Sequence, residues 1–137
     1  MSFNLSNIRW FRVVAGVVIA FVIAFGSLLC MVTGYATYLA FQALGPPDQA
    51  MINEFAASTA EGVVSIFIGV GTLIGGLFAG RKAKVDALKN GVVVGLITAF
   101  VDLALGFFLG FSLWAVVSFV LAVGGGYLGG LLASKRA

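Results

Sequence analysis

Asp102 has the clearest capacity for chemistry in this sequence, because it is an acid in the middle of a long apolar run. A charged side chain at that depth of a membrane costs at least about 2.5–3.5 kcal/mol, so such acids carry ions or protons or bond to neighbouring helices. The chain has no histidine and a single cysteine, Cys30. Without an imidazole or a cysteine pair, we expect no catalytic residue, no metal site and no cofactor.

The residues at helical spacing from Asp102 are small or carry hydroxyl groups. The face that a helix over 91–110 would share with Asp102 comprises Gly91, Gly95, Thr98, Gly106 and Gly110. We expect this face to pack against other helices and not against lipid. No Lys, Arg or His lies at a similar depth, so we expect a protonated Asp102 that donates a hydrogen bond. The candidate partners are the hydroxyl groups of Thr98, Ser118, Ser65 and Thr72.

The basic residues all lie at the ends of apolar segments, on what would be one side of a membrane. They are Arg9, Arg12, Arg81, Lys82, Lys84, Lys89, Lys135 and Arg136. The segment between the first two apolar runs carries only the acids Asp48, Glu54 and Glu61. Because lysine and arginine are retained in the cytoplasm during membrane insertion, we predict that both termini and the 81–90 loop are cytoplasmic. The basic residues of that loop would then contact lipid headgroups.

The composition leaves no room for a soluble domain. Of the 137 residues, 61% are hydrophobic and only 9% are charged, whereas a soluble domain has about 25% charged residues. We therefore predict one all-α transmembrane domain over 1–137, an integral membrane four-helix bundle. Its spans are expected near 12–36, 61–80, 91–110 and 113–133. The net charge of +3 follows from this topology, so we expect the lipid bilayer as a partner and no nucleic acid.

The outer segment 42–60 is expected to hold a short interfacial helix of its own. Gly45-Pro46-Pro47 ends the first span, because proline cannot continue a helix. Asp48 would then cap a helix over 48–55. Ser58 and Glu61 have the spacing of a capping box, which predicts that the second span begins separately near 61.

Nineteen glycines are a second conspicuous feature of the chain. Those expected to pack helices together are Gly71, Gly75, Gly76, Gly80, Gly91, Gly95, Gly106, Gly110, Gly125, Gly126, Gly129 and Gly130. Many are four residues apart and so lie on one helix face, where close approach of backbones supplies van der Waals contact in lipid. Such faces either close the bundle or bind another subunit. Because the span over 113–133 carries glycines on more than half of its circumference, we expect some of them to face a partner.

The ends of the second and fourth spans repeat each other. The segments GTLIGGLFAGRKA at 71–83 and GGYLGGLLASKRA at 125–137 share glycines and alanines at a constant offset. Both would run from the outside to the inside, so a true repeat would relate two parallel helical hairpins by an axis along the membrane normal. A duplication and the convergence of two glycine-rich helix ends both explain the pattern.

The string GGLFAGRKAKVDALKNGVVVGLI at 75–97 resembles the GGxxAGRxA…GxxxG signature of small uncharacterised four-helix membrane proteins of bacteria and archaea. That resemblance implies a prokaryotic plasma membrane and no known activity. The same region also resembles the rotor-ring proteolipid hairpin of ATP synthases, although RKAKVDALKN stands where that family has an Arg-Gln/Asn-Pro loop. By that resemblance Asp102 would be the ion-binding carboxylate, and the glycine-rich helix would contain Gly69, Gly71, Gly75 and Gly80.

We expect a non-enzymatic packing or accessory subunit that assembles through glycine-rich helix faces, as a homo-oligomer or within a larger membrane complex. The alternative is a small transporter or channel component that uses Asp102. A transporter normally has several convergent polar groups and broken helices near the membrane midplane. This chain offers Asp102 with scattered hydroxyl groups, which favours the first function.

Overall fold

The computed structural model describes residues 8–81, 86–109 and 112–135, and these form four helices. The helices are α1 (Trp10–Ala43), α2 (Gln49–Gly80), α3 (Ala87–Leu109) and α4 (Leu113–Lys135). All four are long and apolar enough to cross a membrane. The prediction of an all-α membrane four-helix bundle is confirmed, and the chain is a multi-pass membrane protein.

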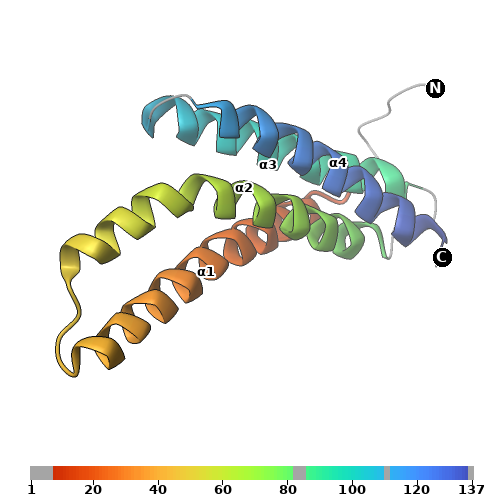
Figure 1. Ribbon diagram of the computed structural model, residues 1–137. Coiled ribbons are helices and arrows are strands. Elements are labelled where there is room, and N and C mark those ends of the chain that lie inside the picture. The colour runs from red at the N-terminus through yellow and green to blue at the C-terminus, as the bar shows by residue number, and fades with distance from the viewer. Residues whose placement is uncertain (1–7, 82–85, 110–111, 136–137) are drawn as a thin grey trace.

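The helix α2 is the centre of the bundle, since it packs against each of the other three. Helix α3 also packs against α1 and α4, whereas α1 and α4 make no contact within the described residues. Helices α1 and α2 have 34 and 32 residues, which corresponds to about 50 Å, while α3 and α4 have 23 each. The α1–α2 hairpin therefore extends beyond the α3–α4 hairpin and diverges from it at the end where both hairpins turn (Figure 1).

Helix α2 is longer than the sequence suggested, because it runs without a break through the segment expected to be a separate short helix. Asp48 does cap it, accepting a hydrogen bond from the backbone N–H of Ala50 at 2.8 Å. Ser58 lies inside the helix and donates to the carbonyl oxygen of Phe55, so the predicted capping box with Glu61 is wrong. Neither glycine nor proline occurs between Asp48 and Glu61, and nothing there interrupts the helix.

Helix α3 begins at Ala87, inside the segment 81–90 that was expected to be a loop. Alanine, leucine and lysine are strong helix formers, which explains the early start. Lys89 lies in the first turn and forms an ion pair with Asp86 at 2.8 Å. Of the other residues predicted to contact headgroups, Arg81 is the exposed C-cap of α2. Lys82 and Lys84 lie outside the described residues.

Ten of the glycines predicted to pack helices are buried between helices: Gly71, Gly75, Gly76, Gly80, Gly91, Gly95, Gly125, Gly126, Gly129 and Gly130. A Cβ atom placed on Gly75 would overlap the carbonyl oxygen of Gly16 on α1, and one on Gly129 would overlap that of Leu73 on α2. The backbones therefore approach as closely as the absence of side chains allows. Gly106 is only half-buried, and a Cβ atom placed on it would lie 3.8 Å from the Cβ atom of Ala115, which is an ordinary contact distance. Gly110 lies outside the described residues.

Four of the five glycines of α4 are used inside the bundle, which leaves Gly124 as the glycine of α4 that is open to a partner. Gly125 and Gly129 approach α2, while Gly126 and Gly130 approach α3. Only Gly124 is exposed, with nothing within 4 Å of a Cβ position. The reason is that α4 lies in the groove between two helices and therefore needs small residues on two of its sides.

The repeated ends of α2 and α4 run in the same direction and pack against each other (Figure 1). A Cβ atom on Gly125 would meet the carbonyl oxygen of Gly69 and the hydroxyl group of Thr72. This parallel arrangement is the one that a duplicated hairpin requires. Whether the hairpin was duplicated stays a prediction.

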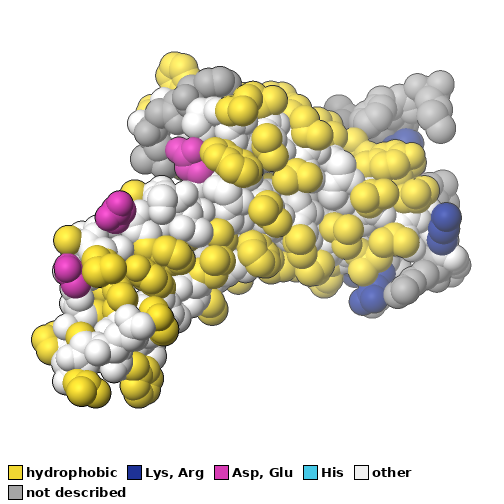
Figure 2. Space-filling view, viewed as in Figure 1, with side chains coloured by type: hydrophobic (Ala, Val, Ile, Leu, Met, Phe, Trp, Pro, Cys, Tyr) yellow, Lys and Arg dark blue, Asp and Glu magenta, His cyan; other side chains and the backbone are white. Residues whose placement is uncertain are grey.

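The charged side chains separate to the two ends of the bundle. On the face shown in Figure 2, acidic side chains gather at the end where both hairpins turn, and Lys and Arg side chains lie at the opposite end. We call these the acidic end and the basic end. By the bounds of the helices, Asp48 and Glu54 at the start of α2 lie at the acidic end, whereas Arg9 before α1 and Lys135 at the end of α4 lie at the basic end. Glu61 lies farther along α2, beside the start of α4.

We predict that the acidic end faces the outside of the cell, because basic residues are retained in the cytoplasm. In a Cys30→Ser background, Leu44→Cys should react with a membrane-impermeant maleimide in intact cells, since Leu44 is 94% exposed. Ser134→Cys, which lies at the basic end and changes no charge, should react only after the cells are opened. Labelling of Ser134→Cys in intact cells without labelling of Leu44→Cys would show the reverse orientation.

Candidate functional site

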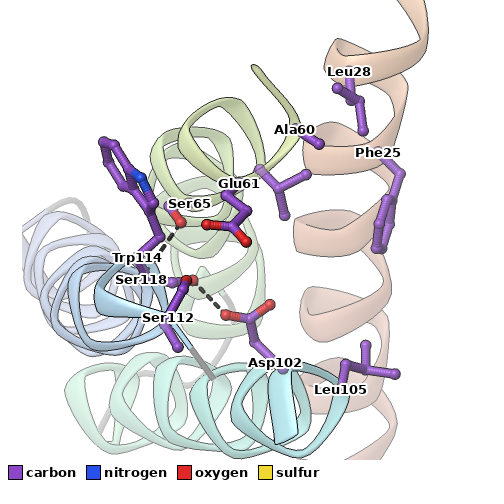
Figure 3. Close-up of a pocket in the computed structure, with 13 residues that line it drawn as sticks. Phe25, Leu28, Ala60, Glu61, Ser65, Asp102, Leu105, Ser112, Trp114 and Ser118 are labelled. Carbon is purple, nitrogen blue, oxygen red and sulfur yellow. Dashed lines mark hydrogen bonds between the residues drawn. The ribbon is translucent and has the colours of Figure 1, made fainter. Parts of the chain in front are cut away.

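A cavity of about 250 Å³ lies between all four helices toward the acidic end, where the two hairpins diverge (Figure 3). Asp102 lines it from α3, together with residues of every other helix. The full lining comprises Phe25, Leu28, Ala60, Glu61, Val64, Ser65, Asp102, Leu105, Gly106, Ser112, Trp114, Ala115 and Ser118. The sequence could not reveal this cavity, because its walls come from four distant segments.

Asp102 and Ser118 are joined by a hydrogen bond across the α3–α4 pair. The Ser118 hydroxyl donates to Asp102 Oδ2 at 2.5 Å (Figure 3). Ser118 is 2% exposed, so the bond is shielded from water on the α4 side. Of the hydroxyl groups considered as partners for Asp102, this is the one that the fold brings to it.

The other candidate hydroxyl groups do not bond to Asp102. Thr72 donates to the carbonyl oxygen of Gly69 on its own helix at 2.9 Å. Ser65 donates across to α4, to the carbonyl oxygen of Trp114 at 3.3 Å. Thr98 is fully buried, and its Oγ1 atom has no hydrogen-bond partner among the described residues. Thr98 therefore belongs to the packed part of α3 and not to the cavity.

The expectation that Asp102 lies on a fully packed face is wrong for this part of α3. Gly91, Gly95 and Thr98 are buried, but Asp102 and Gly106 are only half-buried. This face of α3 is packed at the basic end and open at the acidic end, because α1 and α2 diverge from α3 toward the acidic end (Figure 1). Asp102 consequently borders open space on one side and Ser118 on the other.

Glu61 is a second acid of the cavity that the sequence did not assign to it. Its exposed side chain comes from α2, and Figure 3 shows its carboxyl group directed toward the same space as that of Asp102. The spacing of Glu61 and Ser65 places them on one face of a continuous helix. This four-residue spacing is visible in the sequence, but the expected capping box placed Glu61 at the start of a helix and so hid its relation to Ser65.

Asn90 is a polar residue at the basic end that the sequence also did not single out. It is fully buried and lies in the first turn of α3. Its Oδ1 atom accepts a hydrogen bond from the backbone N–H of Arg9 at 3.1 Å, and its Nδ2 atom donates to the carbonyl oxygen of Asp86 at 3.0 Å. The side chain thereby ties the start of α1 to the start of α3 and supports the end of the bundle opposite the cavity.

The fold and the cavity together define an integral membrane four-helix protein with an acid-lined cavity near one end. The sequence matches no family model, and neither a curated protein nor a solved structure is detectably similar to it. The interpretation of the site accordingly rests on the residues of this chain and on their geometry.

We predict that Asp102→Asn leaves the bundle folded, because the amide oxygen of asparagine can still accept the hydrogen bond from Ser118. Asp102→Leu should lower the free energy of unfolding by about 0.6–2 kcal/mol, the range for one hydrogen bond between membrane helices. Reversible denaturation in mixed micelles would measure both values. Equal stability of the leucine and asparagine variants would show that the Asp102–Ser118 bond contributes nothing to folding.

Proposed function

We propose that this chain is a non-enzymatic subunit of the prokaryotic plasma membrane that assembles with other membrane helices. The contact would be made by the half of α1 nearest the acidic end, either with a second copy of the chain or with another membrane subunit. We place the contact on α1 and not on the glycine-rich sides of α4, because those sides of α4 already pack against α2 and α3 within the bundle.

One observation carries the proposal: one side of α1 is uncovered over a long stretch. Its buried residues are Val13, Gly16, Ala20 and Ala24, followed by none until Leu39. Between Ala24 and Leu39, a Cβ atom placed on Gly26 or on Gly34 would have nothing within 4 Å. The glycines at the centre of the bundle, in contrast, each meet another backbone.

The uncovered side of this stretch, which we call the α1 face, has the composition of a helix–helix interface. It consists of Gly26, Cys30, Thr33, Gly34 and Thr37. Gly26, Cys30 and Gly34 are spaced four apart and so form a shallow groove. Interfaces between membrane helices are enriched in such small and hydroxyl-bearing residues, because they let two backbones approach closely. Lipid chains would contact this groove less completely than a second helix would.

The single cysteine of the chain provides a direct test, because Cys30 is exposed at the centre of the α1 face. Mild oxidation of native membranes should link Cys30 to Cys30 of a second copy, or to a cysteine of another subunit that mass spectrometry would identify. The matched control is Leu29→Cys in a Cys30→Ser background. Leu29 is 68% exposed at the same depth but lies at the edge of the face, about 100° around the helix from Cys30, so it should cross-link less.

A substitution test is independent of cysteine chemistry. Gly34→Leu should reduce the assembled fraction on native gels without lowering the stability of the single chain, because a Cβ atom at this position would have nothing within 4 Å. The control is Gly124→Leu, which adds the same side chain to an open position on α4. If Gly34→Leu left the assembly intact and Cys30 formed no cross-link, the α1 face would be a lipid-facing surface and the proposal would fail.

A further inference from the structure

The cavity at the acidic end is lined by two acidic side chains and by no basic side chain of the described residues. The carboxyl groups of Asp102 and Glu61 both point into it (Figure 3). The ion pair found within the described residues, Lys89–Asp86, lies at the basic end. The other described cations are Arg9, Arg12, Arg81 and Lys135, at or near the same end. A positively charged ligand would therefore meet no like charge from the described part of any helix that lines the cavity.

The walls of the cavity are mainly apolar and aromatic. Phe25 and Leu28 contribute from α1, Leu105 from α3 and Trp114 from α4. The Trp114 ring lies against α2, where a Cβ atom on Gly62 would touch it at 3.6 Å, and the side chain is otherwise exposed. Aromatic faces attract cations with weakly hydrated, apolar bodies. These walls therefore suit an organic cation better than a hydrated metal ion.

The polar groups of the cavity also argue against a metal ion. Calcium takes six to eight oxygen ligands and magnesium a near-ideal octahedron. The cavity offers the carboxyl groups of Asp102 and Glu61 with the hydroxyl groups of three serines, Ser65, Ser112 and Ser118. Within the described residues, no group of three or more His, Cys, Asp or Glu side chains could hold a metal ion.

We propose that this cavity binds a small organic cation with an apolar body. Asp102 keeps one carboxyl oxygen, Oδ2, bonded to Ser118, which leaves the other oxygen for the ligand. Glu61 is exposed on α2 and supplies the second carboxylate. The cavity volume of about 250 Å³ lies below the ~300–1,000 Å³ of sites for drug-sized molecules, so the ligand is small.

The cavity contains its own reporter, since the chain has two tryptophans, Trp10 at the basic end and Trp114 in the cavity wall. Trp10→Phe would leave Trp114 as the only indole. The whole chain, in lipid nanodiscs at constant ionic strength, would be titrated with benzyltrimethylammonium chloride while Trp114 fluorescence is recorded. We expect a saturable change with the cation and none with benzyl alcohol, a neutral aromatic of similar size.

Two acid variants and a matched control test the role of charge. Asp102→Asn and Glu61→Gln should each weaken binding by about tenfold or more, as expected for the loss of one charge-assisted contact. Glu54→Gln removes an acid from the same helix that does not line the cavity, so it should bind like the parent protein. Circular dichroism would verify that each variant is folded. Glu61→Gln is decisive even if Asp102→Asn folds poorly, because the Glu61 side chain is exposed.

Three outcomes would overturn the proposal. One is an equal, saturable response to benzyl alcohol, which would define a purely apolar cavity. Another is unchanged cation binding in both acid variants. The third is a saturable response to sodium or calcium chloride alone that blocks the organic cation, which would define an inorganic ion site. Cross-linking at Cys30 does not depend on this cavity, so the assembly proposal would stand or fall separately.

Discussion

Gly126→Ala should destabilise the bundle, whereas Gly124→Ala, two residues away on the same helix, should not. A Cβ atom on Gly126 would lie 2.5 Å from the carbonyl oxygen of Gly91 and 2.7 Å from the Cα and N atoms of Gly95. These are backbone atoms of α3 and cannot rotate away, so α3 and α4 must separate. Overpacking of this kind costs about 1–3 kcal/mol or more, which exceeds the gain of about 1 kcal/mol in helix propensity.

Gly124→Ala is a close control because it makes the same chemical change in the same helix. Its Cβ atom would have nothing within 4 Å, so the substitution should be neutral or slightly stabilising. Thermal unfolding in detergent, followed by circular dichroism, would give the difference between the two variants. Equal midpoints would mean that α3 and α4 are not in close backbone contact at Gly126.

Asn90→Ala should lower the free energy of unfolding by about 0.5–1.5 kcal/mol, the net contribution of one hydrogen bond, because it removes the acceptor of a part-buried backbone donor. The orphaned group would be the N–H of Arg9, which bonds to Asn90 Oδ1. The carbonyl oxygen of Asp86 would keep its bond to the backbone N–H of residue 90 at 3.0 Å. The damage should therefore be concentrated at the first turn of α1.

Hydrogen exchange would locate this effect, with faster exchange expected for the backbone amides that open α1. Asn53→Ala is the appropriate control, since Asn53 lies in a helix but is exposed and accepts only from Gln49, at 3.3 Å. Alanine has the higher helix propensity, so this control should be neutral or slightly more stable. An Asn90→Ala protein with the stability of the control would exclude Asn90 as a structural tie.

The two ends of the bundle are built differently, and this difference positions the cavity. At the basic end, all four helices are drawn together by glycine contacts and by the Asn90 hydrogen bonds. Toward the acidic end, α1 and α2 stay in contact through side chains, as in the stacked rings of Tyr35 and Phe55 at 4.1 Å, while their hairpin separates from α3 and α4 (Figure 1). The hairpins can therefore diverge there without breaking the backbone contacts that close the other end.

The fold class could be predicted from the sequence, because the apolar runs, the charge distribution and the glycine spacing all depend on local composition. The sequence also predicted ten of the glycines that lie between helices, since residues four apart must share a helix face. It misjudged the start of α2 because a capping box marks only a local preference. A continuous stretch without glycine or proline overrode that preference.

The sequence could not predict which glycine faces meet or which polar groups come together, because these depend on how the helices cross. The sequence named four possible hydroxyl partners for Asp102, and the crossing of α3 and α4 brought Ser118 to it. The α4 glycines are occupied because α4 lies in a groove between two helices, whereas Gly26 and Gly34 are free because α1 leaves the bundle. The meeting of Glu61 with Asp102 depends on that same divergence. Such contacts join residues far apart in the chain, and helical periodicity carries no information about how whole helices are placed relative to one another.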